Sequence, residues 1–587
     1  MSNSWLTKAR YGLFIHHGLY SLLRHGERVW NSGATERTHN TRQITQILGL
    51  SIALLALSSG LHAVEPNQTK IKTMNSKTEP LIRIREVISS TPWGGWVKES
   101  MPLDLRQRMF LPFWSEARLR RHIEMLKAFG FNSIQVTVPT VALWCGADLE
   151  SWRKRQLFML RTARELGMST SQFVWGAAVA DPARKGAGML EAQQVSELDW
   201  HKPIDRARLE AWYRDQAECG PFVDRVVTHW VDPGHEQEGG IDTVIEMHNF
   251  IMAVYREKNP GIHGYLSAWF MDNFVGKRYP GYTDEGVLAA NKRLDRDSGV
   301  ALGRLNYSCD GLNTVGGNSG MTLADRESRV SGEILDAIAA AGRQAGVWGW
   351  YTSDVEINPA LHVRTDVMQN YFRNLPSQAR TQLAWHSIDD NFPGLNMQNL
   401  YVAGKLMQDP SLDAQALLEE FCRGFVGEGN TLAVTAALRA IEQARTRSLL
   451  YNARVEDALA PVSGAKAPPL PASWLDDASK AVDAAIAGMK TVQMAPDFKT
   501  AWPVTMEPAE YLPELNAHLE AIRQMLAFLK GEREVEVLQD NGAPKEQIEA
   551  AIAALPAVIY DPAHTAGLEA GIYKQKLAAL KTATGTK

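Results

Sequence analysis

The sequence predicts an α/β protein with a TIM-type (β/α)8 barrel followed by an α-helical domain. Between residues 87 and 408, β-branched or aromatic runs alternate with amphipathic stretches, which is typical of βα units around a parallel sheet. Eight such runs within about 320 residues fit a barrel with insertions. Beyond residue 408 helical periodicity prevails.

The eight predicted strands are short runs that end at aromatic or polar residues. They cover residues 86–90, 133–138, 170–175, 224–230, 263–269, 301–306, 346–351 and 382–387. Helices are predicted between them, for example over 115–129 and 241–258, where apolar residues recur at helical spacing. A doubly wound open sheet is the alternative fold, but no predicted strand leads into a G-x-G-x-x-G or P-loop pattern.

Composition excludes several classes of protein. Apolar residues make up 45% and charged residues 22% of the 587, as in ordinary globular proteins. A net charge of −4 argues against a nucleic-acid partner. The four cysteines form no C-x-x-C pair, which argues against a zinc knuckle or redox centre. Seventeen tryptophans are an unusual feature, and indole faces suit the stacking of sugar rings.

Residues 44–86 contain an apolar segment and a linker. Arg37 and Arg42 precede an apolar core over 47–61, and the next charged residue is Glu65. This is the form of a secretory signal, so we expect export to the periplasm or the outside of the cell. An uncleaved membrane anchor over 44–63 and a buried helix are the alternatives. About 43 residues precede the segment, which is unusual for a signal peptide.

The fragment 1–43 carries a specific pattern. From Trp5 to Ser21 it reads W-L-T-K-A-R-Y-G-L-F-I-H-H-G-L-Y-S, and 26–30 read G-E-R-V-W. The pattern resembles the first barrel strand of the α-L-fucosidase family of glycoside hydrolases. The resemblance implies that His16 binds the sugar. The match covers roughly 30 residues, Arg28 departs from it, and the family's later His-His-Asp-Gly-Phe segment is absent. Three interpretations of the fragment remain open. It is a fused remnant of such a protein, a stretch upstream of the true start of translation, or a segment that completes an active site elsewhere in the chain.

Carboxylates and aromatic residues follow the predicted barrel strands, at the end where TIM-barrel active sites lie. The candidate catalytic acids are Asp232, Asp354, Glu356 and Asp390. The candidate substrate-binding residues are His229, Trp230, Trp269, Asp272, Trp348, Trp350, Tyr351 and His386, together with His16. Glycoside hydrolysis requires two carboxylates, one that protonates the leaving oxygen and one that attacks or activates water. The sequence therefore predicts a glycoside hydrolase with a carbohydrate substrate.

Asp232 is the first candidate among the acids. The run W-V-D-P-G over 230–234 is similar to the W-x-D-G setting of the fucosidase nucleophile, with a proline inserted. An N-cap or Asx-turn is the alternative role for Asp232. Glu356 or Asp354 is the expected partner, because neighbouring aromatic residues raise the pKa of a general acid. Asp389 and Asp390 are adjacent, so at most one of them faces a cleft.

We expect no cofactor and no catalytic metal, because no H-x-H follows the first predicted strand. Two other functions remain open. One is a carbohydrate-binding barrel without a working acid pair. The other is a carbohydrate lyase or epimerase with His229 or Tyr351 as base.

Residues 409–587 are predicted to be helical. Leucines and an isoleucine between 512 and 529 alternate spacings of three and four, and a Pro/Ala-rich connector covers 460–471. Residues 409–422 read D-P-S-L-D-A-Q-A-L-L-E-E-F-C. This junction resembles that of uncharacterised bacterial glycosidase-like barrels, which implies a glycosidase-like architecture but names no sugar. We expect the helices to buttress the barrel. The sequence does not indicate an oligomeric state.

Overall fold

The structure is a computed structural model. It describes residues 80–89, 110–137, 143, 146–177, 179, 198–229, 240–267, 291–302, 335–348, 361, 363–375, 381–390, 394–446, 472–556, 577–578 and 580–582. The fucosidase-like fragment, the apolar segment and the 460–471 connector lie outside these residues.

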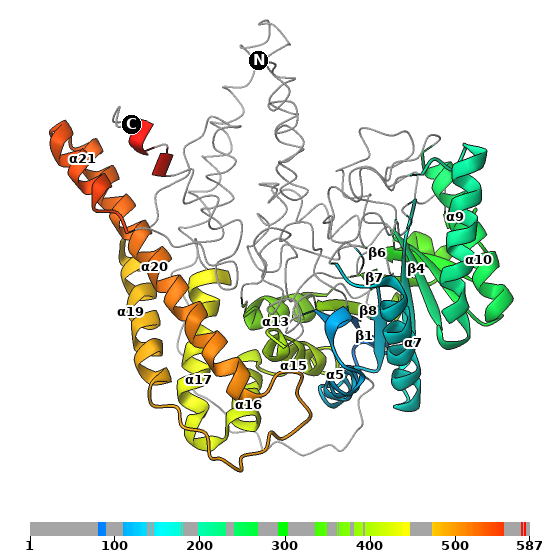
Figure 1. The fold of residues 1–587 in the computed structure, drawn as a ribbon, viewed down its shortest axis with the longest axis horizontal. Helices are drawn as coiled ribbons and strands as arrows, with labels where there is room; N and C mark the ends of the chain where they lie inside the picture. Colours follow the sequence, from blue (N-terminus) through cyan, green and yellow to red (C-terminus); the bar gives the residue numbers. More distant parts are fainter. Residues whose placement is uncertain are drawn as a thin grey trace, which may run out of the picture.

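Eight parallel strands form a closed barrel in chain order (Figure 1). They are β1 (Arg85–Ser89), β2 (Ser133–Val136), β3 (Ser169–Trp175), β4 (Arg225–His229), β5 (His263–Ser267), β6 (Ser298–Leu302), β7 (Ala345–Trp348) and β8 (Leu383–Asp390). β8 pairs back onto β1, which closes the barrel. The predicted TIM-type fold is confirmed.

The largest difference from the prediction is at β6. This strand begins at Ser298, three residues ahead of the predicted start at 301. The preceding turn explains the shift, because the Ser298 backbone N–H donates to the Asp295 carbonyl and pairing with Gly264 of β5 starts there. The short run Ser-Gly-Val-Ala-Leu carries a glycine, which weakens a strand signal read from sequence.

Helices surround the strands. They include α5 (Glu116–Ala128), α7 (Leu149–Glu165), α9 (Pro203–Gln216), α10 (Ile241–Lys258), α13 (Thr365–Asn374) and α15 (Met397–Leu406). The bounds of α10 are those predicted. α5 begins after Ser115, whose hydroxyl caps the helix by accepting from the Arg118 backbone N–H.

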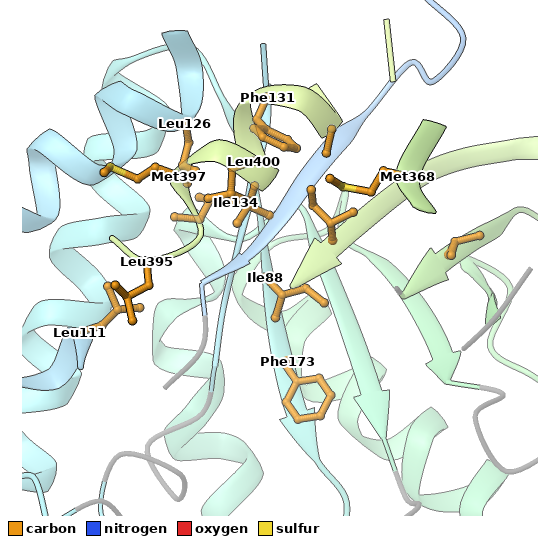
Figure 2. Close-up of a cluster of buried hydrophobic side chains, with 14 of the residues drawn as sticks. Ile88, Leu111, Leu126, Phe131, Ile134, Phe173, Met368, Leu395, Met397 and Leu400 are labelled. Atoms are coloured by element: carbon orange, nitrogen blue, oxygen red, sulfur yellow. The ribbon is translucent and has the colours of Figure 1, made fainter. Parts of the chain in front are cut away.

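Apolar side chains fill the space between the strands and the helices. Figure 2 shows Leu126 of α5 and Met397 and Leu400 of α15 gathered near Ile134 of β2. All four side chains are fully buried. Burial of such side chains stabilises a fold by roughly 1.5–3 kcal/mol each. This layer therefore holds the barrel wall against its outer helices.

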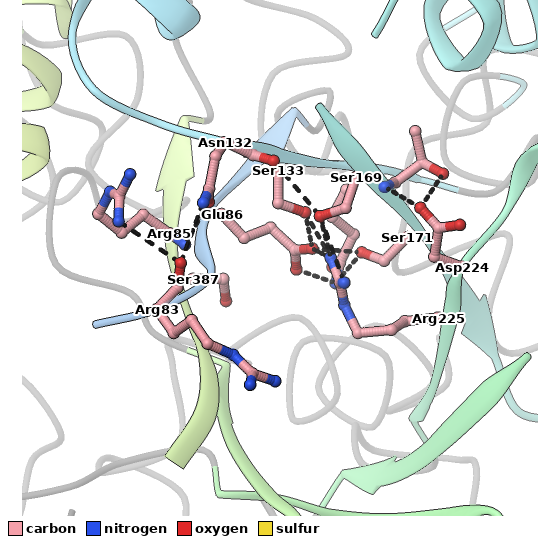
Figure 3. A network of polar contacts seen from close by, with 12 residues as sticks. Arg83, Arg85, Glu86, Asn132, Ser133, Ser169, Ser171, Asp224, Arg225 and Ser387 are labelled. Carbon is pink, nitrogen blue, oxygen red and sulfur yellow. Dashed lines mark hydrogen bonds and ion pairs between the residues drawn. The ribbon is translucent and has the colours of Figure 1, made fainter. Parts of the chain in front are cut away.

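A cluster of polar side chains lies inside the barrel near the amino ends of the strands. We call this cluster the floor; it consists of Glu86, Ser133, Gln135, Ser171 and Arg225. The Glu86 carboxylate accepts hydrogen bonds from Ser133 and Ser171, both at 2.8 Å, and from Gln135 at 3.1 Å. Arg225 of β4 forms an ion pair with Glu86 at 2.7 Å and also contacts Ser133 (Figure 3). Because both charges are buried and well hydrogen-bonded, this network occupies the floor without an unpaired carboxylate.

Trp385 fills the interior near the amino ends of β7 and β8. The centroid of its ring lies 5.2 Å from the centroid of the Tyr265 ring of β5, in an edge-to-face arrangement. Gly346 of β7 makes room for the indole, since a Cβ at this position would lie 2.1 Å from Trp385. The barrel is thus a packed core at this level and not a channel.

The residues after 408 that the structure describes are mainly helical, as predicted. The helices are α16 (Ala414–Val426), α17 (Glu428–Ile441), a π-helical turn (Glu442–Thr446), α19 (Ala472–Met489), α20 (Pro508–Asp540) and α21 (Lys545–Ala553). The apolar stripe of α20 is buried from Leu515 to Leu529, while Leu512 is partly exposed. Helices α17, α19 and α20 lie to one side of the barrel (Figure 1).

The helical region contacts the barrel through specific side chains. Trp502 stacks on Tyr401 of α15 with ring centroids 5.0 Å apart. The Tyr511 hydroxyl donates to Gln398 Oε1 at 3.0 Å. Glu442 caps α13, because its carboxylate accepts from the Thr365 hydroxyl and from the Asp366 backbone N–H. None of the helices among the described residues is both long and apolar enough to cross a membrane.

Candidate active site at the carboxyl ends of the strands

One cluster of aromatic and hydrogen-bonding side chains lies inside the barrel near the carboxyl ends of β3, β4 and β5. His229, the last residue of β4, holds its Nδ1 2.9 Å from the Ser267 hydroxyl of β5. The rings of Phe173 and Trp175 of β3 lie 5.4 Å and 6.3 Å from the His229 ring. The four side chains are at most 2% exposed. We call these four residues the lumen cluster.

The alternation of strand side chains explains the cluster. On β3 the positions of Ser171, Phe173 and Trp175 share one face, because side chains in a strand repeat every two residues. Ser171 contacts Glu86 in the floor, so this face is the interior one. On β4, Arg225 and His229 share the interior face for the same reason. The interior therefore carries the Glu86–Arg225 ion pair near its amino end and the rings of the lumen cluster at its carboxyl end.

Backbone hydrogen bonds hold the end of β4. The Gly176 N–H donates to the His229 carbonyl at 2.7 Å. The Tyr213 hydroxyl of α9 donates to the Gly176 carbonyl at 2.6 Å, and burial raises the pKa of Tyr213 far above its ordinary value. The hydroxyl therefore stays protonated and acts as a donor. These contacts tie β3, β4 and α9 together beside the lumen cluster.

A second histidine braces the outer face of β4. His248 of α10 holds Nδ1 2.7 Å from the Thr228 hydroxyl and Nε2 2.9 Å from the Ser298 hydroxyl of β6. Burial lowers the pKa of His248 to about 3, so its imidazole is neutral at neutral pH. Its two nitrogens link β4 to β6 behind β5.

Asp390, a predicted catalytic acid, lies on the outer face of β8. Its Oδ2 is 3.9 Å from Nε2 of His122 of α5, and both side chains are fully buried. Burial, and then the charge of Arg118, lower the pKa of His122 to about 3. The imidazole is therefore neutral, and the contact is not an ion pair at neutral pH. The structure does not bring Asp390 together with the lumen cluster.

The surroundings of His122 do not form a Ser-His-Asp triad. Its Nε2 lies 3.3 Å from the Ser89 hydroxyl and also faces Asp390, while Nδ1 lies 3.1 Å from the Thr505 hydroxyl. In a triad the serine and the aspartate contact opposite nitrogens of the imidazole. The arrangement instead links the ends of β1 and β8 to the helical region.

His386, a predicted substrate-binding residue, also lies outside the interior. Its Nε2 is 2.7 Å from the Tyr371 hydroxyl of the outer helix α13. Its neighbour Trp385 faces Tyr265 in the interior, as the alternation along β8 requires. Burial lowers the pKa of His386 to about 3. A ligand within the barrel would be separated from His386 by the strand itself.

The remaining predicted site residues are not described in side-chain detail. Trp348 ends β7, and its backbone pairs with Ser387. The residues outside the described ranges are His16, Trp230, Asp232, Trp269, Asp272, Trp350, Tyr351, Asp354 and Glu356. Of the predicted set, His229 is the residue whose side chain the structure places inside the barrel at the expected end.

Phe173, Trp175 and Ser267 are not among the site residues predicted from the sequence. Phe173 and Trp175 follow Ser171 at steps of two, which is the available signal for an aromatic interior face. Ser267 carried no signal of its own, because its importance depends on the position of His229. In the part of the chain that the structure describes, no three His, Cys, Asp or Glu side chains gather to hold a metal ion.

No protein-family model and no curated protein matches this chain. Among solved structures it is similar to CpGH84B, with 11% identity, coverage of 86% of this chain and 77% of that one, and a TM-score of 0.47. It is also similar to a glycoside hydrolase 5 lichenase from Caldicellulosiruptor sp. F32 in complex with cellotetraose, with 12% identity, coverage of 60% and 100%, and a TM-score of 0.35.

A third similar structure is the chitobiase FjGH20 from Flavobacterium johnsoniae, with 10% identity, coverage of 85% and 78%, and a TM-score of 0.31. These structures are glycoside hydrolases. At such identities and TM-scores, the similarities do not determine what this chain binds or cleaves. Nothing in them is specific to the fucosidase-like residues 4–30.

Proposed function

We propose that this protein is a glycoside hydrolase that binds a carbohydrate at the carboxyl end of the barrel. The lumen cluster is the observation that supports this proposal most. It combines aromatic rings, which suit the apolar faces of sugars, with a histidine, which suits their hydroxyl groups. It lies at the end of the barrel where TIM-barrel enzymes carry their active sites.

In this proposal Asp232 is the first catalytic carboxylate. It follows His229 by three residues, and three residues of chain span at most about 11 Å. This limits the distance between the Cα atoms of His229 and Asp232 whatever path the chain takes. The second carboxylate is Glu356 or Asp354, which follow the end of β7. One carboxyl group protonates the leaving oxygen, and the other attacks the anomeric carbon or activates water.

α-L-Fucosidase is the most specific activity that we propose. It rests on the resemblance of residues 4–30 to that family, and His16 would bind the sugar in it. We also propose that the apolar segment 44–63 directs export, because it has the form of a signal sequence.

A carbohydrate lyase or epimerase is the second candidate. The observation in its favour is the position of His229, an imidazole inside the barrel at the carboxyl end of β4. Histidine is the side chain most often used as a general base. Product analysis separates the two candidates, since a lyase leaves an unsaturated sugar and a hydrolase consumes water.

Replacement of Asp232 by Asn tests the proposed hydrolase directly. We expect turnover of a responsive aryl glycoside to fall by at least about a hundredfold, because the acid–base or nucleophilic group is removed. Asp224→Asn is a suitable control. Asp224 lies next to the opposite end of β4, where its carboxylate accepts from the Thr170 N–H at 2.9 Å. Equal turnover in Asp232→Asn and the unaltered protein would contradict the role of Asp232.

A panel of aryl glycosides that includes an α-L-fucoside should be tested on the full chain and on a chain that begins at Val64. Turnover by both would place the active site in the barrel. Fucoside turnover by the full chain alone would mean that His16 completes the site. Sugar binding without turnover by either form would support a carbohydrate-binding barrel in place of an enzyme.

A further inference from the structure

We propose that Arg364 binds an acidic group of the carbohydrate, a carboxylate or a sulfate ester. This inference rests on the proposed function in one respect, namely that the ligand is a carbohydrate. Arg364 directly precedes α13 and is 6% exposed, and its Nε is buried without a hydrogen-bond partner. Among the residues that the structure describes, no carboxylate forms an ion pair with the Arg364 guanidinium.

A buried guanidinium without a counter-ion indicates a ligand that carries negative charge. Arginine stays protonated in proteins, so burial cannot make it neutral. The loss of hydration is strongly unfavourable for an ion, and buried charges are therefore normally paired. The floor of this barrel shows the usual arrangement, because Arg225 lies 2.7 Å from the Glu86 carboxylate. A planar guanidinium matches two oxygen atoms of a carboxylate or sulfate.

The carboxylates around the start of α13 and the end of β8 have other partners. Glu442 accepts from the Asp366 backbone N–H at 3.0 Å, and the Asp366 carboxylate accepts from Gln415 Nε2 at 2.7 Å. Asp390 of β8 faces α5. The negative charges of Glu442 and Asp366 disfavour an anion at the first turn of α13. The proposed contact is therefore the guanidinium of Arg364 and not the end of the helix.

A second buried donor lies at the adjoining end of α15. The Arg364 backbone N–H donates to Asn399 Oδ1 at 2.9 Å, which joins the start of α13 to the first turn of α15. Asn396 precedes Asn399 by one helical turn and is 1% exposed. Its Nδ2 is buried without a hydrogen-bond partner. Two donors without partners, Arg364 Nε and Asn396 Nδ2, therefore belong to adjoining helix ends, and both suit an oxyanion.

Arg364 lies level with the carboxyl end of β8. The chain runs from α13 into β8 through a short connection, so the helix and the strand are antiparallel. The Tyr371 hydroxyl contacts His386 of β8 at 2.7 Å. Arg364 precedes Tyr371 by two helical turns, roughly 10 Å, which corresponds to about three residues of a strand. Arg364 is therefore at the same end of the barrel as the lumen cluster.

The strand order places the two features on different sides of that end. The lumen cluster belongs to β3, β4 and β5, whereas Arg364 lies beside β8, and four strands separate β4 from β8 in either direction around the barrel. A ligand that contacts both extends across the carboxyl end of the barrel. The acidic group therefore need not belong to the sugar that is cleaved.

The first test measures thermal unfolding without any acidic ligand. Arg364→Met removes a buried charge that has no internal partner, so we expect an unchanged or higher unfolding temperature. Arg373→Met is the matched control, because Arg373 lies at the other end of α13 and donates to the Pro410 carbonyl at 3.3 Å. A clear decrease for Arg364→Met would mean that the guanidinium is paired within the protein and would overturn the proposal.

The second test is isothermal titration calorimetry of the full chain with D-glucuronate, D-glucose 6-sulfate, D-glucose and inorganic sulfate. We expect one of the acidic sugars to bind at least about tenfold more tightly than glucose, and the better of the two identifies the acidic group. Arg364→Met should weaken its binding by about ten- to a hundredfold, and Asn396→Ala by about three- to tenfold. Arg364→Lys should retain part of the affinity, and Arg373→Met all of it.

Three results of the titrations would overturn the proposal. One is equal affinity for glucose and for both acidic sugars. Another is equal affinity of the unaltered protein and Arg364→Met for the acidic sugars. The third is binding of inorganic sulfate as tightly as either acidic sugar, because the site would then be one for a free anion.

Aryl glycosides separate this proposal from the proposed function. If acidic sugars bind through Arg364 but no aryl glycoside of the panel, neutral or acidic, is cleaved, the binding role is supported and the hydrolase function fails. If neutral aryl glycosides are cleaved, and Arg364→Met alters neither their turnover nor the binding of any acidic sugar, the hydrolase function is supported and the role of Arg364 fails.

Discussion

The carboxylate of Glu86 and the guanidinium of Arg225 meet at 2.7 Å inside the barrel, although they are 139 residues apart in the chain. The pair joins β1 to β4 across the floor, where Ser133 and Ser171 also donate to Glu86. Figure 3 shows these side chains converging on the carboxylate. An ion pair and hydrogen bonds therefore connect the strands near the amino end of the interior. The lumen cluster lies near the carboxyl end.

Breaking this buried pair should destabilise the protein strongly. Arg225→Met leaves the Glu86 carboxylate buried without its cation, and we expect a loss of about 3–5 kcal/mol in the free energy of unfolding. The double change Glu86→Leu with Arg225→Met should recover most of that loss, because both charges are gone. Denaturation in urea measures both.

The control for the buried pair is an exposed one. Arg293 and Asp242 form an ion pair in which the side chains are 50% and 66% exposed. Arg293→Met should cost less than about 1 kcal/mol. Equal costs for Arg225→Met and Arg293→Met would contradict the importance of the buried network.

The buried His248 should make stability depend on pH. Its pKa falls from 6.5 to about 3 in the folded protein because burial penalises the charged imidazole. Between these values the unfolded chain binds a proton that the folded chain does not. The stability contribution of neutral His248 is thus fully present above pH 6.5 and is lost as the pH falls toward 3, by about 1.4 kcal/mol per pH unit.

Urea unfolding between pH 7 and pH 4 measures this dependence, to which His122 and His386 contribute in the same direction. His248→Gln keeps polar atoms facing Thr228 and Ser298 but cannot titrate. We expect the slope of stability against pH to be shallower in this variant by about one proton. An unchanged slope would show that His248 is not buried as a neutral group.

Gly346 should not tolerate a side chain. A Cβ at this position would lie 2.1 Å from the Trp385 indole, so Gly346→Ala forces the ring or the strand to move. We expect a loss of about 1–3 kcal/mol, as for other overpacked cores. Thermal unfolding measures the loss.

Gly429 of α17 is the matched control, because no atom lies within 4 Å of its added Cβ. Gly429→Ala should leave stability unchanged or raise it by up to about 1 kcal/mol, since alanine favours a helix. A neutral Gly346→Ala would mean that the Trp385 ring is not held where the structure places it.

The order of the elements follows from the sequence. Alternating strand and helix signals predicted eight βα units, and the helix over 241–258 was predicted to the residue because its apolar spacing is regular. The buried stripe of α20 was predicted for the same reason. These features depend on local periodicity, which a sequence displays directly.

Which face of a strand looks into the barrel was decided only by the tertiary structure. Every residue of β4 is buried, because one face packs inside the barrel and the other packs against helices. Hydropathy along such a strand does not alternate, so it does not show which side chains face the interior. His386 and Asp390 were therefore predicted to share a site with His229, although their side chains lie on the outer face of β8. By itself the sequence determined that a barrel forms and in which order its strands follow. Closure of the sheet then decided that His229 meets Ser267 and that Asp390 meets His122, because strand pairing sets the register and the register sets the face.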